Sequence, residues 1–157
     1  MGQALGLNYM TIAIKEIQPQ HYGKGMELVK SAIMDYVGKF DIDPIDFNFK
    51  AKNFFVTPGN ISRAILCDDE IIGFFVCTHY DSLWNNEKKL SMELFYLKAE
   101  HRTEININKV YAYIENYAFT NGYVSIQFDD SLPYFSDYVK GFDETRQISV
   151  RYEKEVI

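Results

Sequence analysis

The start of one predicted helix has residue types and a spacing that suit the binding of an anion. Apolar residues recur at helical spacing from Thr103 to Asn121, with Thr103 as a candidate N-cap and Gly122 beyond the last turn. A helix N-terminus favours an anion, because its first N–H groups are unpaired and its dipole is positive there. Arg102 adds a cation beside it. We therefore expect an anion site; the alternative is an ordinary capped turn, with Arg102 in solvent and Ile107 in the core.

Glu93 is a carboxylate whose predicted neighbours suit a general base. It lies in a predicted strand whose alternation puts Glu93 on one face with Phe95 and Leu97. Desolvation among apolar neighbours would suit a general base, which has to take up a proton near neutral pH. The alternative is a carboxylate at the rim of the sheet, paired with Lys88 or Lys89.

The elements that position these residues alternate between strand and helix signals. Asp43-Pro44 reads as an N-cap followed by proline, and Asp68-Asp69-Glu70 separates two β-rich runs of a hairpin. In chain order the pattern predicts a strand at 11–17, a helix at 24–37 capped by Gly38, a shorter helix from 43, two strands within 62–80, a strand at 88–98, a helix at 103–121, a strand at 124–128, a short helix at 132–140 and a strand at 146–156. This order predicts one α/β domain with a mixed α+β sheet over residues 11–157, after a short leader at 1–10.

Composition excludes several classes of protein. The chain has 157 residues and is 47% hydrophobic, which is enough for one packed domain. Its net charge of -6 argues against nucleic acid as a partner, since nonspecific binding needs clustered Lys and Arg. Cys67 and Cys77 form no Cys-x-x-Cys pair and no His cluster is present, so we expect no metal site and a reducing compartment. The leader lacks a basic start and a long apolar run, which predicts a cytoplasmic protein with no membrane span.

Three local patterns, and the order of the elements, resemble the GNAT superfamily of acyl-CoA-dependent N-acyltransferases. CDDEIIGFF is similar to the family's hairpin, in which an acidic turn leads into an apolar pair, a glycine and aromatic residues. ELFYLKAEHR, followed by the long helix and NGYVSIQF, is similar to the family's fourth strand, pyrophosphate loop, third helix and fifth strand. Gly141-Phe142 resembles the Gly-Phe that follows the family's fourth helix. The matches cover roughly residues 11–152 and imply the GNAT fold.

The resemblance implies that the predicted helix start binds the pyrophosphate of acetyl-CoA or another acyl-CoA. The family's loop reads Arg/Gln-x-x-Gly-x-Gly/Ala, in which small residues let the backbone approach the phosphates. Arg102 matches the first position, the glycine positions fall on Ile105 and Ile107, and Glu104 adds a negative charge. The cofactor-binding residues implied in this way are Leu97, Lys98, Ala99, Arg102, Thr103, Glu104, Ile105, Asn106, Ile107 and Asp130.

The resemblance also implies a catalytic base and a catalytic acid. Some family members place a general base at the strand position of Glu93, and the general acid is often a tyrosine four residues before the glycine of Gly-Phe. That position is Asp137 here, while Tyr138 lies one residue later and Tyr134 is a second candidate. The alternative for both tyrosines is an ordinary place in the core or at its rim.

Two functions from different classes follow from these patterns. The first is an N-acetyltransferase that transfers an acyl group from an acyl-CoA to a small-molecule or peptide amine. The second is a noncatalytic GNAT-like binding or structural module that has lost acyl-CoA binding. An unrelated α+β binding domain is a third option. The resemblance predicts that strands near 90–98 and 123–128 run parallel and diverge at their C-terminal ends, and the supply of aromatic residues leaves a homodimer open.

Overall fold

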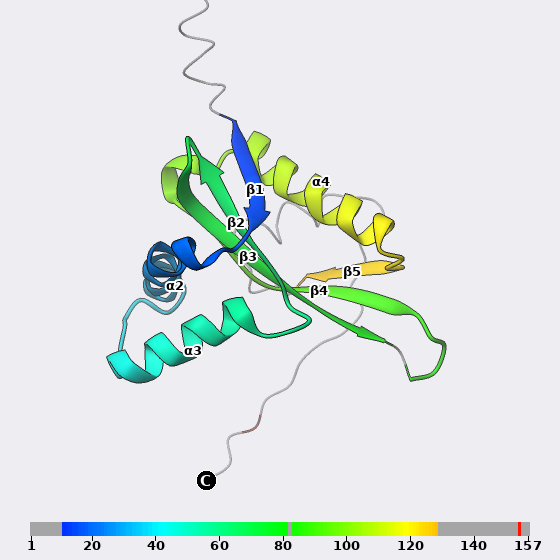
Figure 1. Cartoon of the computed structure of the whole chain (residues 1–157), viewed down its shortest axis with the longest axis horizontal. Coiled ribbons are helices and arrows are strands. Elements are labelled where there is room, and N and C mark those ends of the chain that lie inside the picture. The colour runs from blue at the N-terminus through cyan, green and yellow to red at the C-terminus, as the bar shows by residue number, and fades with distance from the viewer. Residues whose placement is uncertain (1–10, 82, 129–153, 155–157) are drawn as a thin grey trace, which may run out of the picture.

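Five strands form one mixed sheet in the computed structural model, which describes residues 11–81, 83–128 and 154 (Figure 1). The strands lie side by side in chain order: β1 (Ile12–Glu16), β2 (Ile61–Cys67), β3 (Glu70–Asp81), β4 (Lys88–Leu97) and β5 (Ser125–Phe128). The first three pairings are antiparallel, whereas β4 and β5 run parallel. The predicted mixed α/β sheet is therefore confirmed.

Helices cover both faces of the sheet (Figure 1). α2 (Tyr22–Val37) and α3 (Pro44–Val56) pack on the face that carries Phe74 and Val76. α4 (Glu104–Thr120) packs on the opposite face, which carries Phe75 and Cys77, the residues that alternate with Phe74 and Val76 along β3. Two single 3-10 turns, η1 (Pro19–His21) and η2 (Ala99–His101), were not predicted. Among the described helices, none is both long and apolar enough to cross a membrane.

The ends of the helices follow the signals in the sequence. The Asp43 carboxylate accepts hydrogen bonds from the N–H groups of Ile45 and Asp46, both at 3.0 Å, so it caps α3 as predicted. α2 ends at Gly38, whose φ of 87° lies in the left-handed region that favours glycine. These local signals fix where α2 ends and where α3 begins, and hence which residues cover the sheet.

The β2–β3 hairpin also forms as predicted, around the two-residue turn of Asp68 and Asp69. Both residues have positive φ angles, 50° and 64°, as in the primed turns that suit the twist of a hairpin. Gly73 of β3 lies against the neighbouring strand: a Cβ added there would come within 2.4 Å of the backbone oxygen of Tyr96. The glycine of the IIGFF run is therefore required for the close approach of β3 and β4.

Several predicted features lie outside the described residues. They are the leader at 1–10, the short helix at 132–140, the strand at 146–156, Gly141-Phe142, and the site candidates Asp130, Tyr134 and Tyr138.

Candidate active site

The candidate site begins where β4 and β5 lie parallel. Their described pairing runs from Lys89 opposite Ser125 to Met92 opposite Phe128, which confirms the predicted parallel arrangement. β4 then continues to Leu97, and α4 begins after a short loop that contains η2. Ligands of open α/β sheets bind outside the carboxyl ends of parallel strands, so this end of β4 is where a ligand is expected.

The loop between β4 and α4 uses most of its own N–H groups. Lys98 donates to the carbonyl of Ile72 at 2.9 Å, and Thr103 donates to the carbonyl of His101 at the same distance. The N–H groups of His101 and Arg102 donate to loop carbonyls in the η2 turn. Among the other predicted contact residues, Leu97 is buried, the Lys98 ammonium lies 3.8 Å from Glu70, and Ala99 is exposed. Most backbone N–H groups of this loop therefore donate to carbonyl groups of the protein itself.

The first turn of α4 leaves two backbone donors available. The Thr103 hydroxyl accepts from the N–H of Asn106 at 3.2 Å, which confirms Thr103 as the N-cap. The buried Asn106 side chain donates to the His101 carbonyl at 2.8 Å and so ties the helix to the loop. The N–H groups of Glu104 and Ile105 have no hydrogen-bond partner among the described residues. They form the part of the predicted anion site that is open to a ligand.

The two isoleucines at the family's glycine positions lie in different environments. Ile105 is 58% exposed beside the available N–H groups, whereas Ile107 is 7% exposed and packs in the core between the sheet and α4. The alternative that placed Ile107 in the core is therefore correct, because its side chain packs against the sheet. Of the two isoleucines, Ile105 is therefore the one whose side chain can hinder a ligand at the helix start.

Arg102 is held by other parts of the protein. Its Nε donates to the Leu97 carbonyl at 2.6 Å, and one Nη donates to the Asp35 carboxylate of α2 at 2.9 Å. The guanidinium also lies over the Tyr96 ring, 5.4 Å from its centre. The alternative with Arg102 in solvent is wrong, and the Nη atom that bonds Asp35 would have to change partner to bind a phosphate.

Glu93 lies at a β-bulge, and its predicted place on an apolar face is wrong. Cys77 pairs with Met92 and Val76 pairs with Leu94, so Glu93 is an extra residue in β4 with no partner in β3. The bulge reverses the alternation: Met92, rather than Glu93, faces α4 together with Phe95 and Leu97. Glu93 is exposed as a result.

Two hydroxyl groups hold the Glu93 carboxylate. Thr78 donates to Glu93 Oε1 at 3.2 Å and Ser91 donates to the same oxygen at 2.9 Å, while Oε2 has no partner among the described residues. Neither Lys88 nor Lys89 forms an ion pair with it in the described part of the chain. The arrangement leaves one carboxylate oxygen of Glu93 free to accept a proton.

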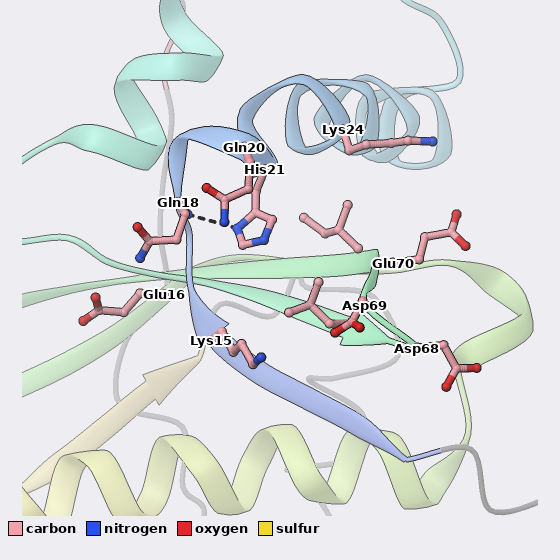
Figure 2. Close-up of a pocket in the computed structure, with 11 residues that line it drawn as sticks. Lys15, Glu16, Gln18, Gln20, His21, Lys24, Asp68, Asp69 and Glu70 are labelled. Carbon is pink, nitrogen blue, oxygen red and sulfur yellow. Dashed lines mark hydrogen bonds between the residues drawn. The ribbon is translucent and has the colours of Figure 1, made fainter.

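A cavity with a volume of about 660 Å³ lies in another part of the described structure. Figure 2 shows it between β1, the start of α2 and the β2–β3 turn, with acidic residues on the turn and His21, Lys15 and Lys24 on the other wall. His21 Nδ1 accepts a hydrogen bond from the N–H of Gln18 at 3.0 Å. No residue of β4, β5 or α4 lines this cavity, so we base the candidate site on the strand and helix ends instead.

The two cysteines are unsuited to nucleophilic catalysis. Both are free and buried, on the neighbouring strands β2 and β3. Burial raises the pKa of the Cys77 thiol to about 12, because a thiolate would be desolvated in the core. Neither cysteine is therefore a candidate nucleophile of this site.

The sequence matches no protein-family model and no curated protein. Solved structures, in contrast, match over nearly the whole chain. A possible acetyltransferase from Clostridium difficile has a TM-score of 0.76 at 17% identity, covering 93% of this chain and 98% of its own. A GNAT family acetyltransferase from Staphylococcus aureus has a TM-score of 0.71 at 12% identity, covering 94% and 100%.

A third similar structure contains a ligand. AAC(6')-Iy, in complex with the bisubstrate analogue CoA-S-monomethyl-acetylneamine, has a TM-score of 0.66 at 15% identity and covers 93% of this chain and 99% of its own. Matches of this quality and coverage show a common fold at low sequence identity. The fold of this chain is that of the GNAT acetyltransferases.

Proposed function

We propose that the protein is an N-acetyltransferase that transfers an acyl group from acetyl-CoA or another acyl-CoA to the amine of a small molecule or peptide. One observation carries this proposal. β4 runs parallel to β5, and the chain continues from β4 through a short loop to the start of α4, where two N–H groups are available. A helix N-terminus at the end of a parallel strand suits a phosphate group. The likeness to a structure with a CoA bisubstrate analogue supports an acyl-CoA as the ligand.

The helix start fits the phosphates of an acyl-CoA in part. The N–H groups of Glu104 and Ile105 would hold them, and a bound acyl-CoA would supply an activated thioester. The exposed Ile105 side chain and the Glu104 carboxylate act against binding, one by bulk and one by like charge. We therefore expect weaker binding than a glycine-containing loop provides.

Glu93 is the proposed base in this reaction. An amine acceptor forms a new N–C bond while the thioester C–S bond breaks, and the amine has to lose a proton. Oε2 of Glu93 would take up that proton, while Thr78 and Ser91 hold Oε1. The leaving sulfur needs a proton in turn, and Tyr138 and Tyr134 are the candidate donors. The net charge of -6 favours the approach of a cationic amine.

A cytoplasmic location agrees with this proposal. Cys67 and Cys77 are free, buried thiols, which is the usual state of cysteines in a reducing compartment.

A noncatalytic module is the second candidate. It is favoured by one observation: Arg102, the residue of the loop that matches the family's pattern, is bonded to Leu97 and Asp35 rather than free to meet a phosphate. In that case the fold would have been kept without the activity.

Calorimetric titration with acetyl-CoA, together with an assay of CoA thiol release with a panel of amines, separates the two candidates. We expect wild-type protein to bind weakly and to release thiol only with an accepted amine. Glu104→Gln should tighten binding by about 2- to 5-fold, since a charge near a helix N-terminus contributes about 0.3–1 kcal/mol. Glu115→Gln removes the same charge farther along α4 and should leave the affinity unchanged. If wild type, Glu104→Gln and Ile105→Ala all stay folded and none binds at millimolar ligand, the noncatalytic module replaces the enzyme.

A further inference from the structure

The ion pair between Arg102 and Asp35 links the loop before α4 to α2, two segments 67 positions apart in the sequence. It is partly open to solvent: the side chain of Arg102 is 25% exposed and that of Asp35 is 48% exposed. Arg102 is therefore neither free in solution nor locked in the core. An exposed pair of this kind contributes little to stability, so one of its partners can be exchanged at low cost.

Asp35 occupies an unfavourable position on its own helix. It lies in the last turn of α2, which ends at Val37, and the negative end of a helix dipole disfavours a carboxylate. That turn contains no basic residue, and the ion pair that the structure gives Asp35 comes from Arg102. Loss of Arg102 would therefore leave Asp35 facing the helix dipole alone.

From these contacts we infer that Asp35 is an internal competitor, which occupies Arg102 and so weakens the binding of a phosphate-bearing ligand at the start of α4. The inference rests on the proposed acyl-CoA site. A phosphate at the Nη atom that bonds Asp35 would replace that carboxylate, while the bond from Nε to the Leu97 carbonyl would keep the side chain at the loop. The exchange carries a small penalty, because Asp35 loses the cation beside the negative end of its helix. The wild-type affinity is thus set partly by a residue of α2.

A double-mutant cycle tests this competition. Affinities for acetyl-CoA and, separately, for inorganic pyrophosphate are measured by calorimetry at constant salt for wild type, Asp35→Asn, Arg102→Gln and the double variant. We expect Asp35→Asn to tighten binding of both probes by about 2- to 10-fold. In the Arg102→Gln background the same substitution should give no gain. Asp46→Asn, which removes a carboxylate from the Lys50 ion pair on α3, controls for the change in net charge and should leave affinity unchanged.

The outcomes separate this inference from the proposed function. If acetyl-CoA binds wild type but Asp35→Asn gives no gain, or an equal gain with and without Arg102, the competition is refuted and the function stands. If pyrophosphate shows the expected cycle while acetyl-CoA binds no variant, the function fails and the competition stands. If folded variants bind neither probe, both fail. Thermal unfolding of each variant verifies that Asp35→Asn, which also relieves the helix dipole, leaves the fold intact.

Discussion

At the scale of single residues, Glu93 owes its surroundings to one extra residue in β4. The bulge turns its carboxylate away from the core, and Thr78 and Ser91 hold one oxygen. If Glu93 is the base, Glu93→Gln should lower turnover by about 10²- to 10⁴-fold, which is the usual contribution of a general base. The affinity for acetyl-CoA, measured by calorimetry, should stay the same, because the helix start is unchanged.

Asp81→Asn is the matched control for Glu93→Gln. Asp81 is an exposed carboxylate at the end of β3, the strand that pairs with the strand of Glu93. Its substitution by Asn changes the net charge by the same amount as Glu93→Gln. The turnover of the Asp81→Asn variant should equal that of wild type. Equal turnover of Glu93→Gln and Asp81→Asn would instead assign Glu93 to an ordinary place on the surface of the sheet.

The two isoleucines of α4 predict opposite effects on stability. Ile107→Ala should lower the free energy of unfolding by about 2–5 kcal/mol, since it leaves a cavity in the core. Ile105→Ala should change it by less than about 0.5 kcal/mol, because that side chain is mostly in solvent. Urea unfolding followed by circular dichroism measures both values. Similar losses for the two variants would contradict the orientation of α4.

At the scale of elements, the contact between β3 and β4 depends on Gly73. A Cβ at this position would meet the Tyr96 oxygen, and backbone cannot move aside as a flexible side chain can. Gly73→Ala should therefore cost at least about 1–3 kcal/mol, the usual range for overpacking. Gly23→Ala is the control, because nothing lies within 4 Å of its added Cβ in α2. It should leave stability unchanged within about 0.5 kcal/mol or raise it. Urea denaturation of the two variants would detect the difference, and equal stabilities would contradict the close approach.

Elements with strong local signals could be predicted from the sequence. Asp43, Thr103 and Gly38 mark helix ends through their own backbone geometry and hydrogen bonds, and the structure places all three as caps. The acidic turn of the β2–β3 hairpin is equally local, because two residues with positive φ close it. The parallel pairing of β4 and β5 is a long-range feature, and only the resemblance in element order predicts it.

The surroundings of the candidate site could not be predicted in the same way. A bulge inserts a residue without changing the local residue types, so the alternation of β4 placed Glu93 on the wrong face. The hydrogen bonds from Thr78 and the ion pair from Asp35 join segments that only the tertiary fold brings together. No local pattern indicated that Arg102 already has a partner.

At the scale of the whole molecule, the core between the sheet and α4 contains Cys77 at its centre. This cysteine is 0% exposed and packs with Phe75, Leu90 and Ile114. Burial raises the pKa of its thiol to about 12, from an ordinary value of 9.0. The folded protein therefore keeps a proton that the unfolded chain releases above about pH 9.

This difference makes stability depend on pH in the alkaline range. Since the folded pKa is the higher one, the contribution of Cys77 to stability is complete below about pH 9 and is lost as the pH rises toward 12. The loss approaches about 1.4 kcal/mol per pH unit, which is the free energy of one unit of pKa difference. Urea unfolding of wild type between about pH 8 and pH 10.5 should show this decline.

Cys77→Ala isolates the contribution of the thiol. The variant should be less stable than wild type near pH 8, because it leaves a small cavity in the core. Its stability should fall less steeply with pH, since the thiol is absent while Tyr123, whose pKa is also raised by burial, is present in both proteins. The two curves should therefore converge as the pH rises from about 8 to 10.5. Parallel curves would mean that Cys77 reaches solvent before it ionises, and that the core between the sheet and α4 opens locally without unfolding of the whole domain.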